Sequence, residues 1–154
     1  DAPARPYSAQ DAEDLHTADE FEKVVLRAPD GSRMPQVLWP VHCVAGTVGA
    51  EYHPDYRTGS VDVHVYKGQG RPSYSAFEGV TEDGTSLSEI LTANEVTAVD
   101  IVGLATDYCV LASAKDAVAQ HLDVRVLTDL VAGVAPETSA AALDELREVG
   151  AAVV

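Results

Sequence analysis

One segment near the middle of the chain joins a strand pattern to a helix pattern across a turn of small residues. Residues 97–104 are rich in apolar and β-branched side chains, and residues 108–121 repeat apolar side chains at three- and four-residue steps. The first pattern is typical of a buried parallel strand, and the second of a helix that packs one face on a sheet. The segment therefore predicts a strand, a turn and a helix, with Cys109 in the first turn of that helix.

Strand and helix patterns alternate along most of the chain. Ser86 and Glu89 form a capping box, which marks a helix start. Further helices are predicted at 87–93 and 136–149, and further strands at 61–66, 123–127 and 151–154. This alternation predicts an α/β fold of three layers, a parallel sheet flanked by helices on both faces. Ligands of such sheets bind beyond the carboxyl ends of the strands.

Cys109 and Lys67 both follow predicted strands. A cysteine at a helix start is exposed to the positive end of the helix dipole, which favours the reactive thiolate. Free cysteine is also among the most buried residue types, so a small core residue is the alternative for Cys109. A lysine near the cysteine would stabilise the thiolate, whereas an isolated lysine is usually only solvated.

Composition and charge limit the class of protein. With 154 residues, of which 46% are hydrophobic, the chain is predicted to be a single domain over residues 1–154. Residues 1–35 are acidic and poor in large apolar side chains, and they include a Pro-Asp-Gly turn at 29–31. We therefore interpret residues 1–35 as an irregular region or an insertion.

The formal net charge of −15 opposes binding to nucleic acid or to anionic membranes. No apolar run is long enough to span a membrane, and no leader pattern is recognised. Two cysteines are too few for a disulfide framework. The sequence thus predicts a cytoplasmic protein with reduced thiols and a small-molecule ligand, and a homo-oligomer stays open.

Three segments together carry a resemblance to a known family. Residues 39–43, then 67–68 with 74–77, then 103–110 resemble the nicotinamidases of the isochorismatase-like cysteine hydrolase superfamily. The resemblance covers about residues 36–154 and implies the isochorismatase-like, Rossmann-like fold of that family. It also implies an amidohydrolase that acts on a linear carboxamide. Such an enzyme converts nicotinamide to nicotinate and ammonia through a cysteine thioester, as a step of NAD salvage and pyridine nucleotide biosynthesis.

The same resemblance assigns roles to the residues around the cysteine. Cys109 matches the nucleophile, Lys67 matches the catalytic lysine, and the backbone N–H groups of Ala105 and Cys109 match the oxyanion hole. The bond between Leu104 and Ala105 matches a cis peptide bond of the family. The resemblance therefore implies that the reacting centre is built on the turn between residues 104 and 109.

The resemblance also assigns binding residues outside the turn. Trp39, Tyr74 and Leu104 match substrate-binding positions, with core packing as the alternative for the two aromatic residues. His42 matches one ligand of a divalent metal site, and the alternative is a histidine satisfied by backbone hydrogen bonds. Imidazole and carboxylate ligands suit zinc, iron or manganese, so the sequence does not choose the ion.

The first strands of the family are not recognisable in the sequence. Residues 1–8 stand where an Asp-x-His motif is expected and contain no histidine, and the catalytic aspartate is not found. The chain is then either a fragment or a protein that has lost part of the site. We expect it to bind a metal only if the missing ligands are supplied, and to be weakly active or inactive by itself.

Two other functions stay open. One is another hydrolase of the superfamily, such as an isochorismatase or an N-carbamoyl amide hydrolase. The other is a non-catalytic homologue that serves as a binding or assembly subunit. The presence of both Lys67 and Cys109 argues against the second, because a binding subunit needs neither.

Overall fold

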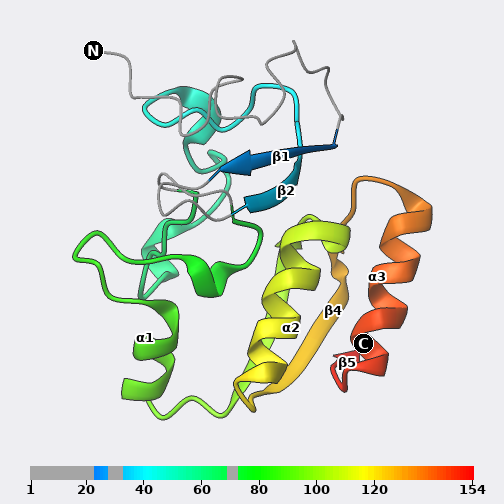
Figure 1. Ribbon diagram of the computed structural model, residues 1–154. Coiled ribbons are helices and arrows are strands. Elements are labelled where there is room, and N and C mark those ends of the chain that lie inside the picture. The colour runs from blue at the N-terminus through cyan, green and yellow to red at the C-terminus, as the bar shows by residue number, and fades with distance from the viewer. Residues whose placement is uncertain (1–22, 28–32, 69–72) are drawn as a thin grey trace. The chain divides into compact units, whose positions relative to one another are not determined.

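The computed structural model describes residues 23–27, 33–68 and 73–154 of the chain (Figure 1). The chain forms two compact units. The first comprises Asp1–Asp62 and Gln69–Pro72, and the second comprises Val63–Gly68 and Ser73–Val154. The single domain expected from the chain length stays a prediction.

The second unit is built on a parallel sheet of three strands in the order β3-β4-β5. Its elements are α1 (Leu87–Ala93), β3 (Ala98–Leu104), α2 (Leu111–Ala119), β4 (Asp123–Ala132), α3 (Pro136–Glu148) and β5 (Ala152–Val153). Helix α2 connects β3 to β4, and α3 connects β4 to β5. The predicted fold class, a parallel sheet flanked by helices, is confirmed.

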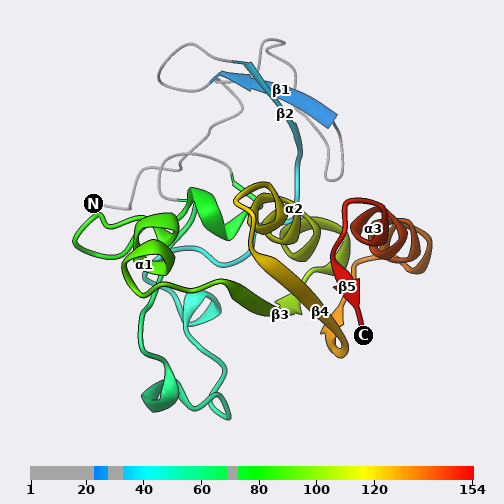
Figure 2. The ribbon, with the colours of Figure 1, turned by 90° about the horizontal axis from the view of Figure 1, so that it is seen from below.

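Helices α2 and α3 pack against each other on one face of this sheet (Figure 2). The core between them contains small residues of α2 and β-branched residues of β4, together with a leucine of α3. Its most buried members are Ala114, Ala117, Val126 and Leu146, and Val124 is buried beside them. The alanines place no bulk between α2 and the sheet, so the helix can approach the strands closely.

Strand β3 is only half buried, so the expectation of a fully buried strand is wrong. Val99 and Ile101 pack against the core, whereas Val102 is 50% and Leu104 73% exposed. Successive side chains of a strand point to opposite faces, and α2 covers only one of them. An apolar run in the sequence does not show how many faces are covered.

The helix start predicted from the capping box is confirmed, whereas one predicted strand does not form. The capping box of Ser86 and Glu89 is present at the start of α1. The strand expected at 61–66 does not form, and only Tyr66 bridges to Val80, with N···O distances of 2.8 and 3.0 Å. Alternation indicates a strand only where a neighbouring strand is available to pair along its length. Lys67 therefore follows an isolated bridge rather than a strand.

The first unit contains an antiparallel hairpin and two 3₁₀ turns among its described residues. Strand β1 (Lys23–Arg27) pairs with β2 (Arg33–Val37), and the turns are Val48–Ala50 and Thr58–Ser60. The interpretation of residues 1–35 as irregular is thus wrong for the two strands, because it ignored the β-branched residues of β1. The Pro-Asp-Gly turn and residues 1–22 lie outside the described residues.

Within the part of the chain that the structure describes, no helix combines the length and apolar character needed to cross a membrane.

Candidate active site

The end of β3 contains two unusual backbone features. Gly103 has a φ of 108°, a conformation open to glycine but strained for other residues. The peptide bond between Leu104 and Ala105 is cis, as the resemblance implied. Ala105 follows in an extended conformation and is the N-cap of the next helical turn.

Cys109 lies in a π-helical turn, Thr106–Val110, which precedes α2. The N–H of Val110 donates to the carbonyl of Ala105 at 3.0 Å, five residues back. The prediction of a helix over 108–121 is corrected by this wider turn, because α2 begins at Leu111 and ends at Ala119. Single π-helical turns are frequent at functional sites.

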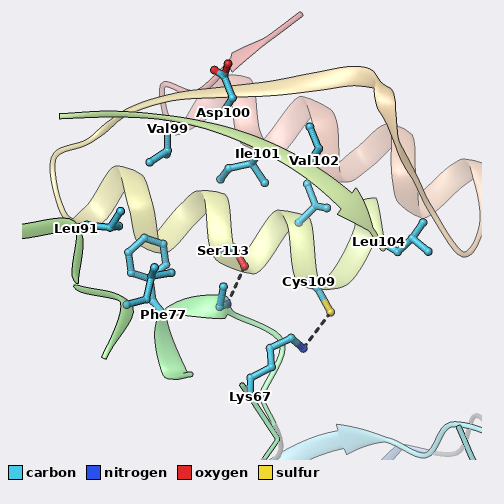
Figure 3. A pocket seen from close by; sticks show the side chains of 13 residues that line it. Lys67, Phe77, Leu91, Val99, Asp100, Ile101, Val102, Leu104, Cys109 and Ser113 are labelled. Atoms are coloured by element: carbon cyan, nitrogen blue, oxygen red, sulfur yellow. Dashed lines mark hydrogen bonds between the residues drawn. The ribbon is translucent and has the colours of Figure 1, made fainter. Parts of the chain in front are cut away.

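Lys67 and Cys109 meet at this turn although they are 42 positions apart in the sequence. The Lys67 Nζ donates to the Cys109 Sγ at 3.4 Å, and the two side chains point toward one another in Figure 3. The same Nζ donates to the carbonyl of Ser73 at 3.0 Å. An ammonium group in contact with a sulfur favours the thiolate form and stabilises negative charge nearby.

The loop that carries Ser73 is tied to α2 by a buried hydroxyl. The Ser113 Oγ accepts a hydrogen bond from the N–H of Ala76 at 2.9 Å, and the Ser75 Oγ accepts one from the N–H of Phe77 at 3.2 Å. Sequence analysis missed Ser113. The signal was a polar residue on the core-facing side of a helix, which needs a hydrogen-bond partner.

A cavity of about 390 Å³ lies against the lysine and the cysteine. Its walls are mainly apolar, and Phe77, Leu91 and Ile101 belong to them. Cys109, Lys67 and Ser113 are among its few polar residues. Small-molecule sites have this character, a mostly apolar cavity with a small number of placed polar groups.

Two tyrosines lie together beside the cysteine. The rings of Tyr74 and Tyr108 have centroids 5.3 Å apart and are tilted by 50°. Burial raises the pKa of Tyr108, and the charge of Asp107 and the proximity of Tyr74 raise it further. The Tyr108 phenol therefore stays neutral at physiological pH. Tyr74, expected at the substrate, thus stands in the same unit as Cys109.

Asp107 shares the π turn with Cys109 but is directed to the start of α3. Its carboxylate accepts hydrogen bonds from the N–H of Val134 at 3.0 Å, from the N–H of Ala135 at 3.3 Å and from the Thr138 hydroxyl. Burial raises the pKa of Asp107, but these hydrogen bonds lower it by more, so it lies below the ordinary value. Asp107 is thus a bound carboxylate rather than a proton acceptor for Cys109.

The remaining predicted residues are placed differently. Leu104 lines the cavity, and Ala105 begins the π turn. Trp39 and His42 belong to the first unit. His42 is exposed, and its Nδ1 lies 2.6 Å from the carbonyl oxygen of Pro40. Within the second unit, the structure thus joins Lys67 and Cys109.

The metal suggested by the resemblance finds no site among the described residues. No group of three or more histidine, cysteine, aspartate or glutamate side chains comes together in residues 23–27, 33–68 and 73–154. A single exposed imidazole does not hold a divalent ion tightly. His42 by itself therefore does not make a metal site in the described part of the chain, and an ion would bind only if further ligands were supplied.

The fold and the site together define the class, a parallel α/β protein with a lysine-paired cysteine at the carboxyl end of a strand. Residues 7–154 match the family described as the isochorismatase domain. The chain belongs to the isochorismatase family.

The chain is also similar to curated proteins of known activity. The nicotinamidase/pyrazinamidase of Mycobacterium tuberculosis is 50% identical over 109 residues, which are 71% of this chain and 59% of that protein. The chain thus spans less than two thirds of this curated relative's length.

Two solved structures have the same fold. Pyrazinamidase of Pyrococcus horikoshii in complex with zinc is 40% identical, with a TM-score of 0.64 over 75% of this chain and 62% of that one. The yeast nicotinamidase bound to the inhibitor nicotinaldehyde is 27% identical, with a TM-score of 0.75 over 91% of this chain and 70% of that one.

Proposed function

We propose that this protein is a nicotinamidase, which hydrolyses nicotinamide to nicotinate and ammonia. The observation that carries the proposal is the 3.4 Å contact between the Lys67 ammonium and the Cys109 sulfur beside an apolar cavity. Relatives that are nicotinamidases support the choice of substrate.

The chemistry proceeds in two steps at the sulfur. The Cys109 thiolate attacks the carboxamide carbon, the C–N bond breaks, and the nitrogen leaves as ammonia after taking up a proton. The product is a nicotinoyl thioester on Cys109. Water then attacks the thioester carbon, the C–S bond breaks, and nicotinate leaves while the thiol is restored.

The turn supplies groups for the negative charge that develops on the carboxamide oxygen. The backbone N–H groups of Ala105 and Cys109 are the proposed oxyanion hole, because both belong to the turn that carries the sulfur. The Lys67 ammonium contacts the Cys109 sulfur and stabilises its negative charge before the attack. Tyr74, Leu104 and Trp39 are the proposed contacts to the pyridine ring.

No proton acceptor for Cys109 is identified among the described residues. Among the described residues, the carboxylate nearest in sequence to Cys109 is Asp107, and its oxygens are taken by Val134, Ala135 and Thr138. General acid–base catalysis typically contributes 10²–10⁴-fold to a rate. We therefore expect the chain by itself to form the thioester but to turn over slowly.

The remaining parts of the proposal concern the metal and the compartment. A zinc-bound relative supports divalent metal binding in the family, and His42 is the candidate ligand in this chain. Both cysteines are free thiols, which supports a reducing compartment such as the cytoplasm.

The test is ammonia release from nicotinamide by the purified chain, with Cys109→Ala as the control. The expected result is slow ammonia release above that of the control. Isochorismate contains no nitrogen, so the alternative hydrolase activity is followed as release of pyruvate from isochorismate, and none is expected. Added zinc, iron or manganese tests His42, because His42→Ala should remove any stimulation by the metal. Equal ammonia release by the chain and by Cys109→Ala would contradict the proposal.

A further inference from the structure

The side chain of Asp107 connects two segments that are distant in the sequence. It lies in the π turn two residues before Cys109, and its partners Val134, Ala135 and Thr138 lie at the junction of β4 and α3. The Asp107 carboxylate accepts three hydrogen bonds from residues that lie 27 to 31 positions away in the sequence. The turn that carries the sulfur is thereby fastened to a helix of the core.

The start of α3 depends on this carboxylate. Ala135 is the N-cap of α3 and has no side chain that can cap, and Pro136 at the next position has no N–H. Asp107 accepts from the N–H of Ala135 and from the hydroxyl of Thr138, so it serves as the cap that the local sequence lacks. The helix and the π turn therefore hold each other in place.

The junction fits closely around these bonds. A Cβ at Gly133 would lie 1.7 Å from the Ser139 Oγ and 3.2 Å from the Asp107 Oδ1, so the loop accepts only glycine without rearrangement. On the other side of the turn, Thr106 and Val110 are buried. The π turn is thus fixed by core packing at its two ends and by Asp107 in between.

We infer that Asp107 is a positioning residue for the nucleophile, which it keeps directed at Lys67 by tethering the π turn to α3. The inference rests on the proposed function only in taking Cys109 as the nucleophile. A displacement of about 1 Å at a reacting group can cost about 10²-fold in rate, so a tether of this kind has a measurable effect.

A purely electrostatic role of Asp107 would change the alkylation rate of Cys109 in the opposite direction. Removing a negative charge two residues from Cys109 favours the thiolate, which would speed alkylation. Loss of the tether lets the sulfur move away from the Lys67 ammonium, which would slow alkylation. The direction of the change therefore separates positioning from a simple charge effect.

The experiment is alkylation of the chain with iodoacetamide, followed by peptide mass spectrometry over a range of pH. Cys43 is exposed and serves as the internal reference. In Asp107→Ala we expect the rate at Cys109 relative to Cys43 to fall about tenfold at neutral pH. Asp107→Asn keeps one acceptor and should recover part of the loss.

Two further variants keep the result interpretable. Thr138→Val removes one of the three bonds but leaves the charge, and it should give a smaller loss of the same sign. Leu143→Ala weakens the packing of α3 without touching Asp107, and it should leave the ratio of the two cysteines unchanged when the chain is folded. An equal loss in Leu143→Ala would reduce Asp107 to a structural role and overturn the inference.

An unchanged or increased ratio in both Asp107→Asn and Thr138→Val would also overturn the inference. Iodoacetamide needs no substrate site, so this result is independent of nicotinamide. If nicotinamide is hydrolysed, Asp107→Asn should lower kcat with little change in KM, because the tether acts on the sulfur and not on the ring. If nicotinamide is not hydrolysed, the proposed function fails while the alkylation result stands.

Discussion

The two units of the chain differ in how their candidate site residues are held. In the second unit, Lys67 and Cys109 stand on a loop and a turn that hydrogen bonds tie to α2 and α3. In the first unit, residues 41–60 are all exposed, and they include His42 and Cys43. Both pairs match positions of the same family. Among the described residues, the buried core cluster lies in the second unit, which carries Lys67 and Cys109.

This difference separates two parts of the proposed enzyme. The chemistry at the sulfur depends on residues that the core positions, so it should respond to substitutions within the second unit alone. The proposed ring contact of Trp39 and the proposed metal ligand His42 belong to the first unit. Substitutions in one unit at a time therefore test whether the second unit alone controls the chemistry at the sulfur.

The largest expected effect is on stability. Leu146 of α3 is 0% exposed, whereas Val48 in the first unit is 83% exposed. Leu146→Ala should lower the free energy of unfolding by about 2–5 kcal/mol, because it leaves a cavity in the core. Val48→Ala should change it by less than about 0.5 kcal/mol. Chemical denaturation of both variants checks the comparison, which fails if Val48→Ala costs as much.

The next effect is on the reactivity of the cysteine. Lys67→Met removes the ammonium that contacts the Cys109 Sγ, so alkylation of Cys109 at neutral pH should slow by about 10- to 30-fold. Arg57→Met removes a cation from the first unit and is the matched control, with no expected change. Stopped-flow alkylation measures both. Equal slowing by the two variants would mean that net charge, not contact, controls the thiolate.

A smaller effect is expected from the link between the loop and α2. Ser113→Ala leaves the N–H of Ala76 without its acceptor, and this should cost about 1 kcal/mol of stability. Because the same loop presents the carbonyl that orients Lys67, reactivity of Cys109 should fall slightly as well. Thr92→Ala, at an exposed position on α1, provides the comparison. If Ser113→Ala is as stable as the unchanged chain, the loop is held by other contacts.

The smallest effect concerns an exposed ion pair across the sheet. Arg125 on β4 donates to both carboxylate oxygens of its cross-strand neighbour Asp100 on β3, at 2.7 and 2.6 Å. The hydrogen bond from Arg125 holds the pKa of Asp100 below its ordinary value. This contribution is therefore present above the unfolded carboxyl pKa, near 3.9, and is lost as the pH falls through the folded value.

Asp100→Asn should flatten the acid limb of the stability curve slightly and leave the neutral region almost unchanged, since surface pairs contribute little. Melting temperatures between pH 2 and pH 7 would show it. A large loss of stability at neutral pH would contradict the assignment of Asp100 and Arg125 to the exposed face of the sheet.

Local signals in the sequence were sufficient for several elements. The capping box at Ser86 and Glu89 predicted the start of α1, and Pro136 predicted the start of α3. These signals depend on contacts within one turn of helix, so they do not need the rest of the fold. The cis bond between Leu104 and Ala105 was expected only because of the family resemblance.

Other features depend on contacts that a local pattern does not contain. The alternation at 61–66 suggested a strand, but the structure offers it a single bridge at Tyr66. Asp107 looked like an ordinary residue of the turn, since its partners lie at least 27 positions away. Ser113 likewise acts through a loop 37 positions distant. Such roles follow from the assembled fold and not from spacing along the chain.

The central claim is that Cys109 attacks nicotinamide, and the most direct measurement is a search for the covalent intermediate. The chain is mixed with nicotinamide, quenched in acid, and examined by intact mass and peptide mapping. The account predicts a nicotinoyl group on Cys109, none on Cys43, and none in Cys109→Ala. A folded chain that never carries the nicotinoyl group on Cys109, or carries it equally on Cys43, would contradict the account.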